Sequence, residues 1–485
     1  MPKLPNHASS AILYQNATKT VILIDIPTSI GVAQRLRQLP QRAEQAIQDD
    51  GLVLVSCDPQ KDPYPNPPEP KTDKARNSVL AQIPEPQQRF HEEIVPLIND
   101  ALQEVKNNHQ GNWCNPRRTR LANCVVAKES EEDLDNEINT SAKSDKELPQ
   151  KRKRRESNTT TTEEGLEEPS FTVVEHESSL SNQPPVILAP GINRFSALSD
   201  TQGPIVQNPS YSQAVLNIKS DGQECTTESG LSHPNRISIN VPPKSAFLNC
   251  HLIPGTETRQ SPLTTLSSDL KFDFILMDPP WPNRSVRRSS HYKEHASPLQ
   301  PLIEGILQNH MHPHKAIVAI WVTNSLKSRS ATLDALKSSG LHPFEEWIWV
   351  KTTVDGQPVF PTDGLWRRPY EVLILAHKEG HVNQDSNTET KDNVCEIKRR
   401  IIVAVPDVHS RKPNLKELIE DLFFSSPTSS GQSSEDEGKN VIRAYSGLEV
   451  FARNLTAGWW ACGDEVVRFN WEGWWDRKVR DGDAA

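Results

Sequence analysis

Short apolar runs follow one another through the second half of the chain, and more polar segments separate them. The runs are rich in Val, Ile, Leu and Trp, which is typical of strands buried on both faces of a sheet. Helices are predicted between them at 331–339 and 414–422. Strands that alternate with helices predict an α/β fold with three layers and a mostly parallel sheet. The predicted strands are 272–277, 317–323, 344–350, 371–376, 401–405, 448–452 and 466–471.

The first part of the chain carries fewer signals of this kind. Residues 20–26 and 52–57 are predicted strands. Residues 89–105 have the spacing of an amphipathic helix, although Pro96 would kink it. No catalytic group of residues is visible in this part.

Polar segments divide the chain. Residues 128–169 have no aromatic residue and no apolar period, which predicts a disordered linker. Insertions at 379–393 and 425–439 are predicted surface loops. All but one of the 11 Trp residues lie at or after position 281, so the main core is expected in the second half. We predict four parts: an N-terminal module (1–127), a charged disordered linker (128–170), a lead-in segment (171–236) and the main domain (237–485).

The composition limits the classes of function. The chain has 485 residues and a net charge of -9, which excludes a general polycation that coats nucleic acid. No apolar run reaches the length of a membrane-spanning helix and the N-terminus has no signal-peptide pattern, so we expect neither a membrane protein nor a secreted one. The seven Cys residues include no CxxC pair, so we expect no metal site and no disulfide scaffold.

The sequence Asp278-Pro279-Pro280-Trp281 directly follows the predicted strand at 272–277. The carboxyl end of a strand is where α/β folds place their chemistry. The two prolines have no N–H to donate, so their carbonyl groups stay available as acceptors. Asp278 and the Pro279 carbonyl form an acceptor pair, and Trp281 adds a flat aromatic face. These groups suit an amino group on a heteroaromatic ring, such as that of adenine, which has two N–H donors and a π face.

Acceptors on both amine hydrogens would favour a pyramidal nitrogen and aim its lone pair at an activated methyl group. A plain turn is the alternative, with Asp278 as a turn former and Trp281 in the core. From these four residues alone, both interpretations remain open.

Further along, the chain resembles a known family in several blocks that occur in one order. The segment MDPPWPNRSVRRSSHYK resembles the DPPW-type N6-adenine methyltransferases of the MT-A seventy family, and within it the branch called methyltransferase-like protein four. WCNPRR at 113–118 and ILYQN near the start also resemble this branch. The matching blocks are VPPKSAF (241–247), SPLQ (297–300), WVTN (321–324), EWIWVK (346–351), RRPYEVLIL (367–375), HSRKP (409–413), LEVFARNLTAGW (448–459) and CGDEVVRF (462–469).

The resemblance implies a Rossmann-type, S-adenosylmethionine-dependent methyltransferase with a permuted motif order, in which the catalytic motif precedes the cofactor loop. It implies that Asp278, Pro279, Pro280 and Trp281 are catalytic. Lys412 would bind the cofactor carboxylate and Glu449 the ribose hydroxyls, which suits a cation and an acid respectively. The implied cofactor contacts are His251, Leu252, Asp278, Lys412, Glu449, Arg453, Asn454, Asp464 and Glu465.

Two features depart from the family pattern. Where relatives have an acid near the adenine of the cofactor, this chain has His251. A neutral imidazole can still accept a hydrogen bond. The segment Phe451-Ala452-Arg453 lacks the glycine of the FGR sequence in many relatives. The chain has no GxGxxG segment either, so the fingerprint of a dinucleotide-binding dehydrogenase is absent.

A local basic loop follows the DPPW sequence. Loops of this kind bind phosphates and give affinity that depends on salt, although a solvated surface loop is the alternative. Tyr370 and Glu371 match the acceptor-adenosine region of the family, and Arg367 and Arg368 add charge beside them. The implied substrate contacts are Asn283, Arg284, Arg287, Arg288, Tyr292, Tyr370 and Glu371.

The branch is associated with adenosine in small nuclear RNA, where the ribose is 2′-O-methylated, and also with adenine in DNA. We expect RNA, with DNA as the alternative. KRKRR at 151–155 is a candidate nuclear import signal, so we expect a nuclear protein, with the cytosol left open. A monomer is expected, because the N-terminal module could cover the face that a partner subunit otherwise would.

Two other classes of function remain open at this point. The family includes members that have lost the DPPW acid and act as non-catalytic scaffolds for RNA. The intact Asp278 and Lys412 argue against that role, whereas His251 and the missing glycine leave it open. An interaction platform built from the N-terminal module and linker is the third class, and no residue there supports it.

Overall fold

The computed structural model describes the chain in segments. The predicted linker, the insertion at 379–393 and most of the insertion at 425–439 lie outside the described residues. The described residues are 10–37, 52–65, 68–119, 184–219, 225–226, 232–233, 236–252, 263, 266, 269–281, 299–378, 397–408, 411–426 and 441–477.

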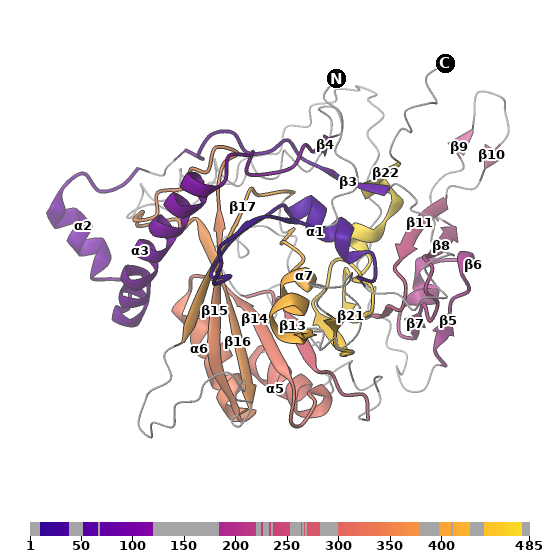
Figure 1. Cartoon of the computed structure of the whole chain (residues 1–485). Coiled ribbons are helices and arrows are strands. Elements are labelled where there is room, and N and C mark those ends of the chain that lie inside the picture. Colours follow the sequence, from indigo (N-terminus) through magenta and orange to yellow (C-terminus); the bar gives the residue numbers. More distant parts are fainter. Residues whose placement is uncertain are drawn as a thin grey trace, which may run out of the picture.

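A sheet of 12 strands forms the centre of the molecule (Figure 1). Strands β12, β21, β20, β13 and β14 pair in parallel, as do β15, β17 and β2, and β16 lies antiparallel between these two groups. The predicted α/β fold with a mostly parallel sheet is confirmed. In sheet order, the strands are β1 (Ile12–Gln15), β2 (Val21–Ile24), β17 (Lys398–Ala404), β15 (Leu341–Lys351), β16 (Tyr370–Lys378), β14 (Ile317–Val322), β13 (Phe274–Met277), β20 (Gly447–Val450), β21 (Trp459–Gly463), β12 (Ala246–Asn249), β7 (Ile205–Gln207) and β5 (Val186–Ile187).

Helices cover both faces of this sheet and make the three predicted layers. Along β14, Val318 and Ile320 face one hydrophobic cluster, whereas Ala319 and Trp321 face the other. The first cluster takes in α3, α5 and α6, and the second takes in α1 and α7. Burial on both faces explains why central strands such as β13 and β14 are apolar at every position. The helices are α1 (Ile26–Ala33), α2 (Asp73–Leu80), α3 (Glu85–Asn108), α5 (Leu299–His310), α6 (Leu326–Ser338) and α7 (Lys416–Ile419), which continues as a π-helix over Glu420–Phe424.

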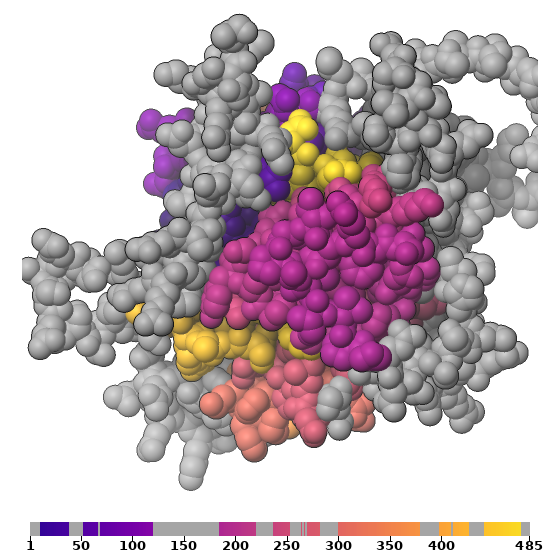
Figure 2. Space-filling view, turned by 90° about the vertical axis from the view of Figure 1, so that its right-hand side faces the viewer, coloured from indigo at the N-terminus to yellow at the C-terminus, as the bar shows by residue number. Residues whose placement is uncertain are grey.

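Small sheets flank the central one. Figure 2 looks onto the face where the residues around β5 to β11 form one magenta surface. The strands of these small sheets are β3 (Leu52–Ser56), β4 (Arg118–Thr119), β6 (Gly191–Phe195), β8 (Ala214–Lys219), β9 (Cys225–Thr226), β10 (Ser232–His233), β11 (Arg236–Val241), β18 (Ser425–Ser426), β19 (Val441–Ile442) and β22 (Trp475–Arg477).

One predicted strand is wrong. Residues 466–471 contain a 3-10 turn, Arg468–Asn470, and the last strand of the sheet is instead β21. Val466, Val467 and Phe469 are apolar because a turn packs them into the core, where the Asn470 side chain accepts the Leu455 N–H at 2.6 Å. The apolar residues in this segment therefore indicate that it is buried, and they do not indicate that its backbone is extended.

The N-terminal segment is part of the central sheet. Strand β2 pairs in parallel with β17, and α3 packs against both strands. The predicted domain boundaries stay a prediction, but the strands at both ends of the chain share one core.

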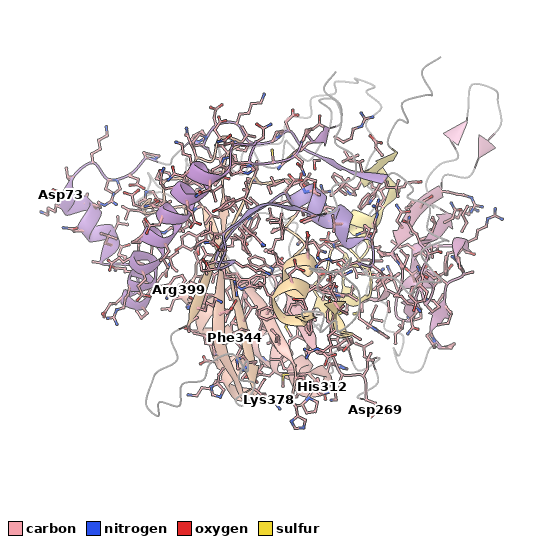
Figure 3. The ribbon with its side chains drawn as sticks, in the orientation of Figure 1. Asp73, Asp269, His312, Phe344, Lys378 and Arg399 are labelled. Atoms are coloured by element: carbon pink, nitrogen blue, oxygen red, sulfur yellow. The ribbon has the colours of Figure 1, made fainter. Side chains whose placement is uncertain are left out.

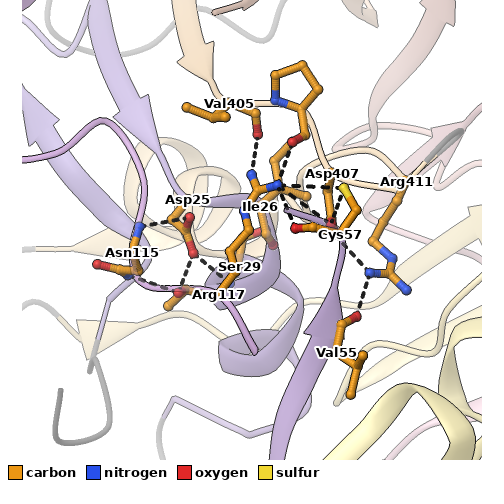
Figure 4. A network of polar contacts seen from close by, with 12 residues as sticks. Asp25, Ile26, Ser29, Val55, Cys57, Asn115, Arg117, Val405, Asp407 and Arg411 are labelled. Carbon is orange, nitrogen blue, oxygen red and sulfur yellow. Dashed lines mark hydrogen bonds and ion pairs between the residues drawn. The ribbon is translucent and has the colours of Figure 1, made fainter. Parts of the chain in front are cut away.

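A buried charge network ties this segment to the loop after β17 (Figure 4). The Asp407 carboxylate lies 2.8 Å from Arg411 Nη1 and 3.9 Å from Arg117 Nη1, and all three side chains are almost fully buried. Arg117 also donates to the Val405 and Pro406 carbonyls, and Arg411 donates to the Val55 carbonyl. Burial would raise the pKa of Asp407, but the two guanidinium groups outweigh it and hold the pKa below its usual range. The network therefore keeps Asp407 charged and fixes the segment that carries residue 412.

Arg411→Ala should destabilise the fold by about 3–5 kcal/mol, because the only cation left near the buried Asp407 carboxylate among the described residues is Arg117, at 3.9 Å. Chemical denaturation measures the effect. Arg89→Ala is the matched control, since its ion pair with Glu85 is exposed and is worth only about 0.2–1 kcal/mol. Equal losses in the two variants would mean that the buried network does not hold the fold.

Candidate active site

The ends of the central strands place the chemistry-bearing residues on one edge of the sheet. Because β12, β13, β14, β15, β20 and β21 run in one direction, their carboxyl ends meet there, and the antiparallel β16 begins there. Phe344, Lys378 and His312 mark the opposite edge in Figure 3. The residues at the carboxyl edge include His251, Asp278, Asn324, Lys351, Glu371 and Asp464.

Four charged side chains form a chain of ion pairs at this edge. Lys412 Nζ lies 3.0 and 2.9 Å from the two carboxylate oxygens of Asp278. It also lies 3.1 Å from Glu371 Oε2, and Glu371 Oε1 lies 2.6 Å from Lys351 Nζ. Asp278 keeps 33% of its side chain exposed, so one side of this carboxylate is open. The site thus presents an acid that is held in place and still accessible.

The pKa shifts show how tightly these charges are coupled. Burial would raise the pKa of Glu371, but Lys351 and Lys412 outweigh it and hold the pKa well below its ordinary value. Burial would likewise lower the pKa of Lys412, but Asp278 and Glu371 raise it above its ordinary value. Both side chains therefore stay charged at neutral pH.

The sequence prediction placed Lys412 on the cofactor carboxylate. In this structure Asp278 and Glu371 already offer acceptors to all three N–H donors of its ammonium group. A cofactor carboxylate would have to share or replace one of them, so this role of Lys412 stays a prediction. Lys351 was not singled out from the sequence, although its position at the end of β15 was the available signal.

The DPPW residues form a compact turn. The Trp281 N–H donates to the Pro279 carbonyl at 2.8 Å, so this carbonyl has one lone pair left for a further donor. The Trp281 ring is 8% exposed, and its Nε1 donates to the Trp321 carbonyl at 2.7 Å. The indole is thus fixed largely in the core, and its predicted use as a stacking face stays a prediction.

The substitution of an acid by His251 has a structural counterpart. His251 Nδ1 lies 2.5 Å from Asp464 Oδ2, and the Leu252 N–H donates to Asp464 Oδ1 at 3.3 Å. The neighbouring strands β12 and β21 bring these residues together. A carboxylate therefore lies at this place after all, supplied by Asp464.

The loop after β20 carries the next predicted contacts. Glu465 Oε2 lies 3.1 Å from Arg453 Nε, and Glu465 Oε1 lies 3.0 Å from Arg468 Nη1. The buried Asn454 Nδ2 has no hydrogen-bond partner among the described residues. Arg453, Asn454 and Glu465 thus lie near one another, with one amide donor unused.

The loop does not need the missing glycine at Ala452. The residue with positive φ is Phe451, at 61°, whereas Ala452 is outside that region. The close approach is made by Gly463, where a Cβ would lie 3.2 Å from the backbone N and O of Ala452. A side chain at Ala452 is therefore tolerated.

Among the described carboxyl groups at this edge, Glu449 has the pKa that is raised most. Burial and the nearby charge of Asp278 raise the pKa of Glu449 to about 8. A carboxyl group with this pKa is partly protonated at neutral pH. Hydrogen-bond donors that approach it would stabilise its charged form. Ribose hydroxyls are such donors.

Tyr370, a predicted substrate contact, is only 3% exposed. Its hydroxyl lies 3.0 Å from His91 Nδ1 of α3, and the two rings stack at 6.0 Å. Burial lowers the pKa of His91 to about 4 and raises that of Tyr370 to about 12, so the contact joins two neutral groups. Tyr370 is thus buried against α3 behind the carboxyl edge of the sheet. Its direct contact with substrate stays a prediction. The role of His91 was missed, because nothing local in the sequence links positions 91 and 370.

The predicted substrate residues Asn283, Arg284, Arg287, Arg288 and Tyr292 lie outside the described residues. Among the described residues, no group of His, Cys, Asp and Glu could hold a metal ion, and no helix has the length and apolar character to cross a membrane. A cavity lined by Glu85, Phe90, Arg329 and Arg399 lies at the start of α3 and contains none of the predicted site residues.

Comparison with known proteins agrees with the sequence blocks. The family model described as MT-A70 matches residues 272–465. The N6-methyladenosine RNA methyltransferase MTA1 of Cryphonectria parasitica is 31% identical over 252 residues, which cover 50% of this chain and 65% of that protein. The N(6)-adenine-specific methyltransferase METTL4 of Homo sapiens is 35% identical over 235 residues, covering 47% and 43%.

A DNA N6-methyl methyltransferase of Caenorhabditis elegans is 27% identical over 217 residues, which cover 43% of this chain and 54% of that protein. The chain thus spans less than two thirds of each of these relatives. The resemblance predicted from the sequence is confirmed.

Glu449→Gln should change how stability depends on pH. Between its ordinary pKa of about 4.5 and its folded pKa of about 8, Glu449 holds a proton in the folded chain that the unfolded chain releases. The free energy of unfolding therefore falls as the pH rises through this window, by at most about 1.4 kcal/mol per pH unit. Gln does not ionise, so the variant should gain on the wild type from about pH 5 to about pH 8.

Chemical denaturation across this pH range measures the difference. Glu304→Gln on α5 is the control, because it keeps the chemistry of the exchange away from the carboxyl edge. A difference between Glu449→Gln and wild type that stays constant with pH would show that Glu449 has no raised pKa.

Proposed function

We propose that the chain is an S-adenosylmethionine-dependent enzyme that methylates N6 of adenine in nucleic acid, because residues 272–465 match the MT-A70 family model. The observation that carries the proposal is the Asp278 carboxylate, which projects from the end of β13 and is held by Lys412 at 2.9 Å. An acid in this position can receive an amine at the edge of the sheet where α/β enzymes bind their ligands.

The residues of the DPPW turn would act by orientation. Asp278 accepts one N–H of the adenine amine, and the remaining lone pair of the Pro279 carbonyl accepts the other. Pro280 restricts the backbone at the centre of the turn that the Trp281 N–H closes on the Pro279 carbonyl, and the Trp281 side chain holds the turn in position through its bond to the Trp321 carbonyl. Two acceptors on the amine draw its nitrogen toward a pyramidal geometry and direct its lone pair. The Lys412 ammonium compensates the charge of Asp278, which keeps the carboxylate an acceptor.

The cofactor would supply an activated methyl group, and the described residues fit its parts. Glu449 suits the ribose hydroxyls, and Lys412 suits the carboxylate. Asp464 contacts both His251 and the Leu252 N–H, and these three residues would bind the adenine of the cofactor. Arg453 and Glu465 lie in the same loops, where the Asn454 amide nitrogen has no hydrogen-bond partner among the described residues. The buried donor without a partner is an observation that favours a polar ligand at this edge.

RNA is the proposed substrate, with DNA as the alternative. The printed name of the Cryphonectria relative includes RNA, and that of the Caenorhabditis relative includes DNA. Within RNA we propose adenosine of small nuclear RNA, including 2′-O-methylated adenosine, on the basis of the resemblance to the methyltransferase-like protein four branch. The basic residues after Trp281 would bind phosphates. We also propose a monomer, and a nuclear location on the basis of KRKRR.

A non-catalytic RNA scaffold is the alternative from another class. The ion pairs around Asp278 favour the enzyme, because a scaffold has no need for an accessible acid held by a half-buried lysine. The test is to incubate the full chain with cofactor carrying a labelled methyl group and an adenosine-containing oligonucleotide, as RNA and as DNA. Label in N6-methyladenine after digestion, identified by mass spectrometry, supports the proposal. Label at another position, or none with either strand, would contradict it.

Asp278→Ala should slow single-turnover methyl transfer by about 10²–10³-fold, the typical cost of one preorganised hydrogen-bond partner. Asp278→Asn should not rescue the rate, because its amide presents donors to the amine. Circular dichroism checks the fold, and Asp334→Ala on α6, which removes an exposed acid, should keep the wild-type rate. A folded Asp278→Ala protein with the wild-type rate would refute the catalytic role of this acid.

A further inference from the structure

Trp366 differs from every other tryptophan of the chain. The structure describes all 11 Trp residues, and among them Trp366 is the exposed one, with 50% of its surface accessible. An exposed indole leaves a large apolar face in water, although a single exposed apolar residue is not by itself evidence of a binding site. The surroundings of Trp366 provide further evidence.

The loop that carries Trp366 is held from the N-terminal segment. The Leu365 N–H donates to Glu69 Oε1 at 2.8 Å, and Arg76 Nη2 donates to the Asp363 carbonyl at 3.3 Å. Glu69 and Arg76 also form an ion pair at 3.1 Å. The backbone beside Trp366 is thus fixed, and its ring is presented without a loop-ordering cost at the moment of binding.

The loop leads directly into the candidate active site. Trp366 precedes Tyr370 by four residues, which span at most about 14 Å of chain. The Pro369 carbonyl between them accepts the Lys351 N–H at 2.7 Å, and Glu371 belongs to the ion-pair chain with Lys412. Trp366 therefore lies at the carboxyl edge of the sheet, within reach of a strand whose adenine is at Asp278.

Positive charge accompanies the exposed ring. Arg367 and Arg368 follow it directly, and the Arg367 guanidinium lies 5.3 Å from the centre of the Phe360 ring. An aromatic face beside cations is the combination by which proteins hold single-stranded nucleic acid, because bases stack on the ring and phosphates meet the charge.

We propose that Trp366 is a stacking platform for a nucleobase that neighbours the target adenine in the substrate strand. The inference rests on the proposed function and adds a second contact site to it, outside the DPPW turn. Every base has a π face, so the platform tolerates different bases and contributes affinity more than sequence choice. It would hold the strand in the single-stranded form that leaves the adenine amine accessible.

The test measures binding without cofactor, so it does not depend on catalysis. The probes are short uridine-rich oligonucleotides with one central adenosine and a fluorescent 2-aminopurine on its 5′ or 3′ side, made as RNA and as DNA. Trp366→Ala should weaken binding of at least one probe by about 5- to 150-fold and remove the stacking-induced quenching of its 2-aminopurine. Trp366→Phe should restore most of both.

Tyr211→Ala is the matched control. Tyr211 is also an exposed aromatic residue beside a cation, with Lys244 Nζ 4.1 Å from its ring centre, but Lys244 precedes β12 and lies at the opposite edge of the sheet. This variant should bind like the wild type.

Wild-type affinity and quenching in Trp366→Ala, an equal loss in Tyr211→Ala, or no binding by the wild-type chain would each overturn the proposal. The first of these results would leave Trp366 as a contact for a protein partner. Failure of the proposed function would appear separately, as absence of labelled N6-methyladenine in a chain whose Trp366 still quenches the probe.

Discussion

A single buried carboxylate, that of Asp407, constrains how the two ends of the molecule meet. A charge with no exposed surface is tolerated only when its partners compensate it. Arg411 follows in the same loop and Arg117 comes from the N-terminal segment. The Arg411 guanidinium is further held over the rings of Phe469 and Trp474, at 4.4 and 4.6 Å, near the end of the chain. Three distant segments are therefore joined around one acid.

The buried network around Asp407 also positions the candidate active site, because Arg411 is directly followed by Lys412. Because Arg411 is held in place, the backbone of the next residue, Lys412, is held as well. The Lys412 ammonium group is thereby positioned to contact Asp278 and Glu371. Those two acids come from β13 and β16, which the sheet brings to the same edge. The N-terminal segment contributes to this edge twice more, through His91 below Tyr370 and through Glu69 and Arg76 beside Trp366. The site thus depends on residues from both halves of the chain.

The sequence predicted what local pattern encodes. Strands buried on both faces produce continuous apolar runs, so β13, β14 and β17 were predictable, as was the position of Asp278 at a strand end. Local pattern does not encode pairing between distant segments. The contact of Lys412 with Asp278 joins positions 134 apart, and the pairing of β2 with β17 follows from the whole core.

Two differences between the sequence prediction and the structure have specific causes. The turn at Arg468–Asn470 was predicted as strand, because burial makes turns and strands equally apolar. The contact of Asp464 with His251 was not predicted, since the register of β12 and β21 is not visible in the sequence, and the roles of both residues as cofactor contacts stay predictions.

The most direct measurement of the central claim is calorimetric titration of S-adenosylmethionine into the full chain. The carboxyl edge of the sheet should bind it at one site. Lys412→Ala should weaken that binding by about 10- to 150-fold, the equivalent of one charge-assisted hydrogen bond of about 1.5–3 kcal/mol. No heat of binding with the wild-type chain, or equal affinity in the two proteins, would contradict the assignment of this edge as the cofactor site.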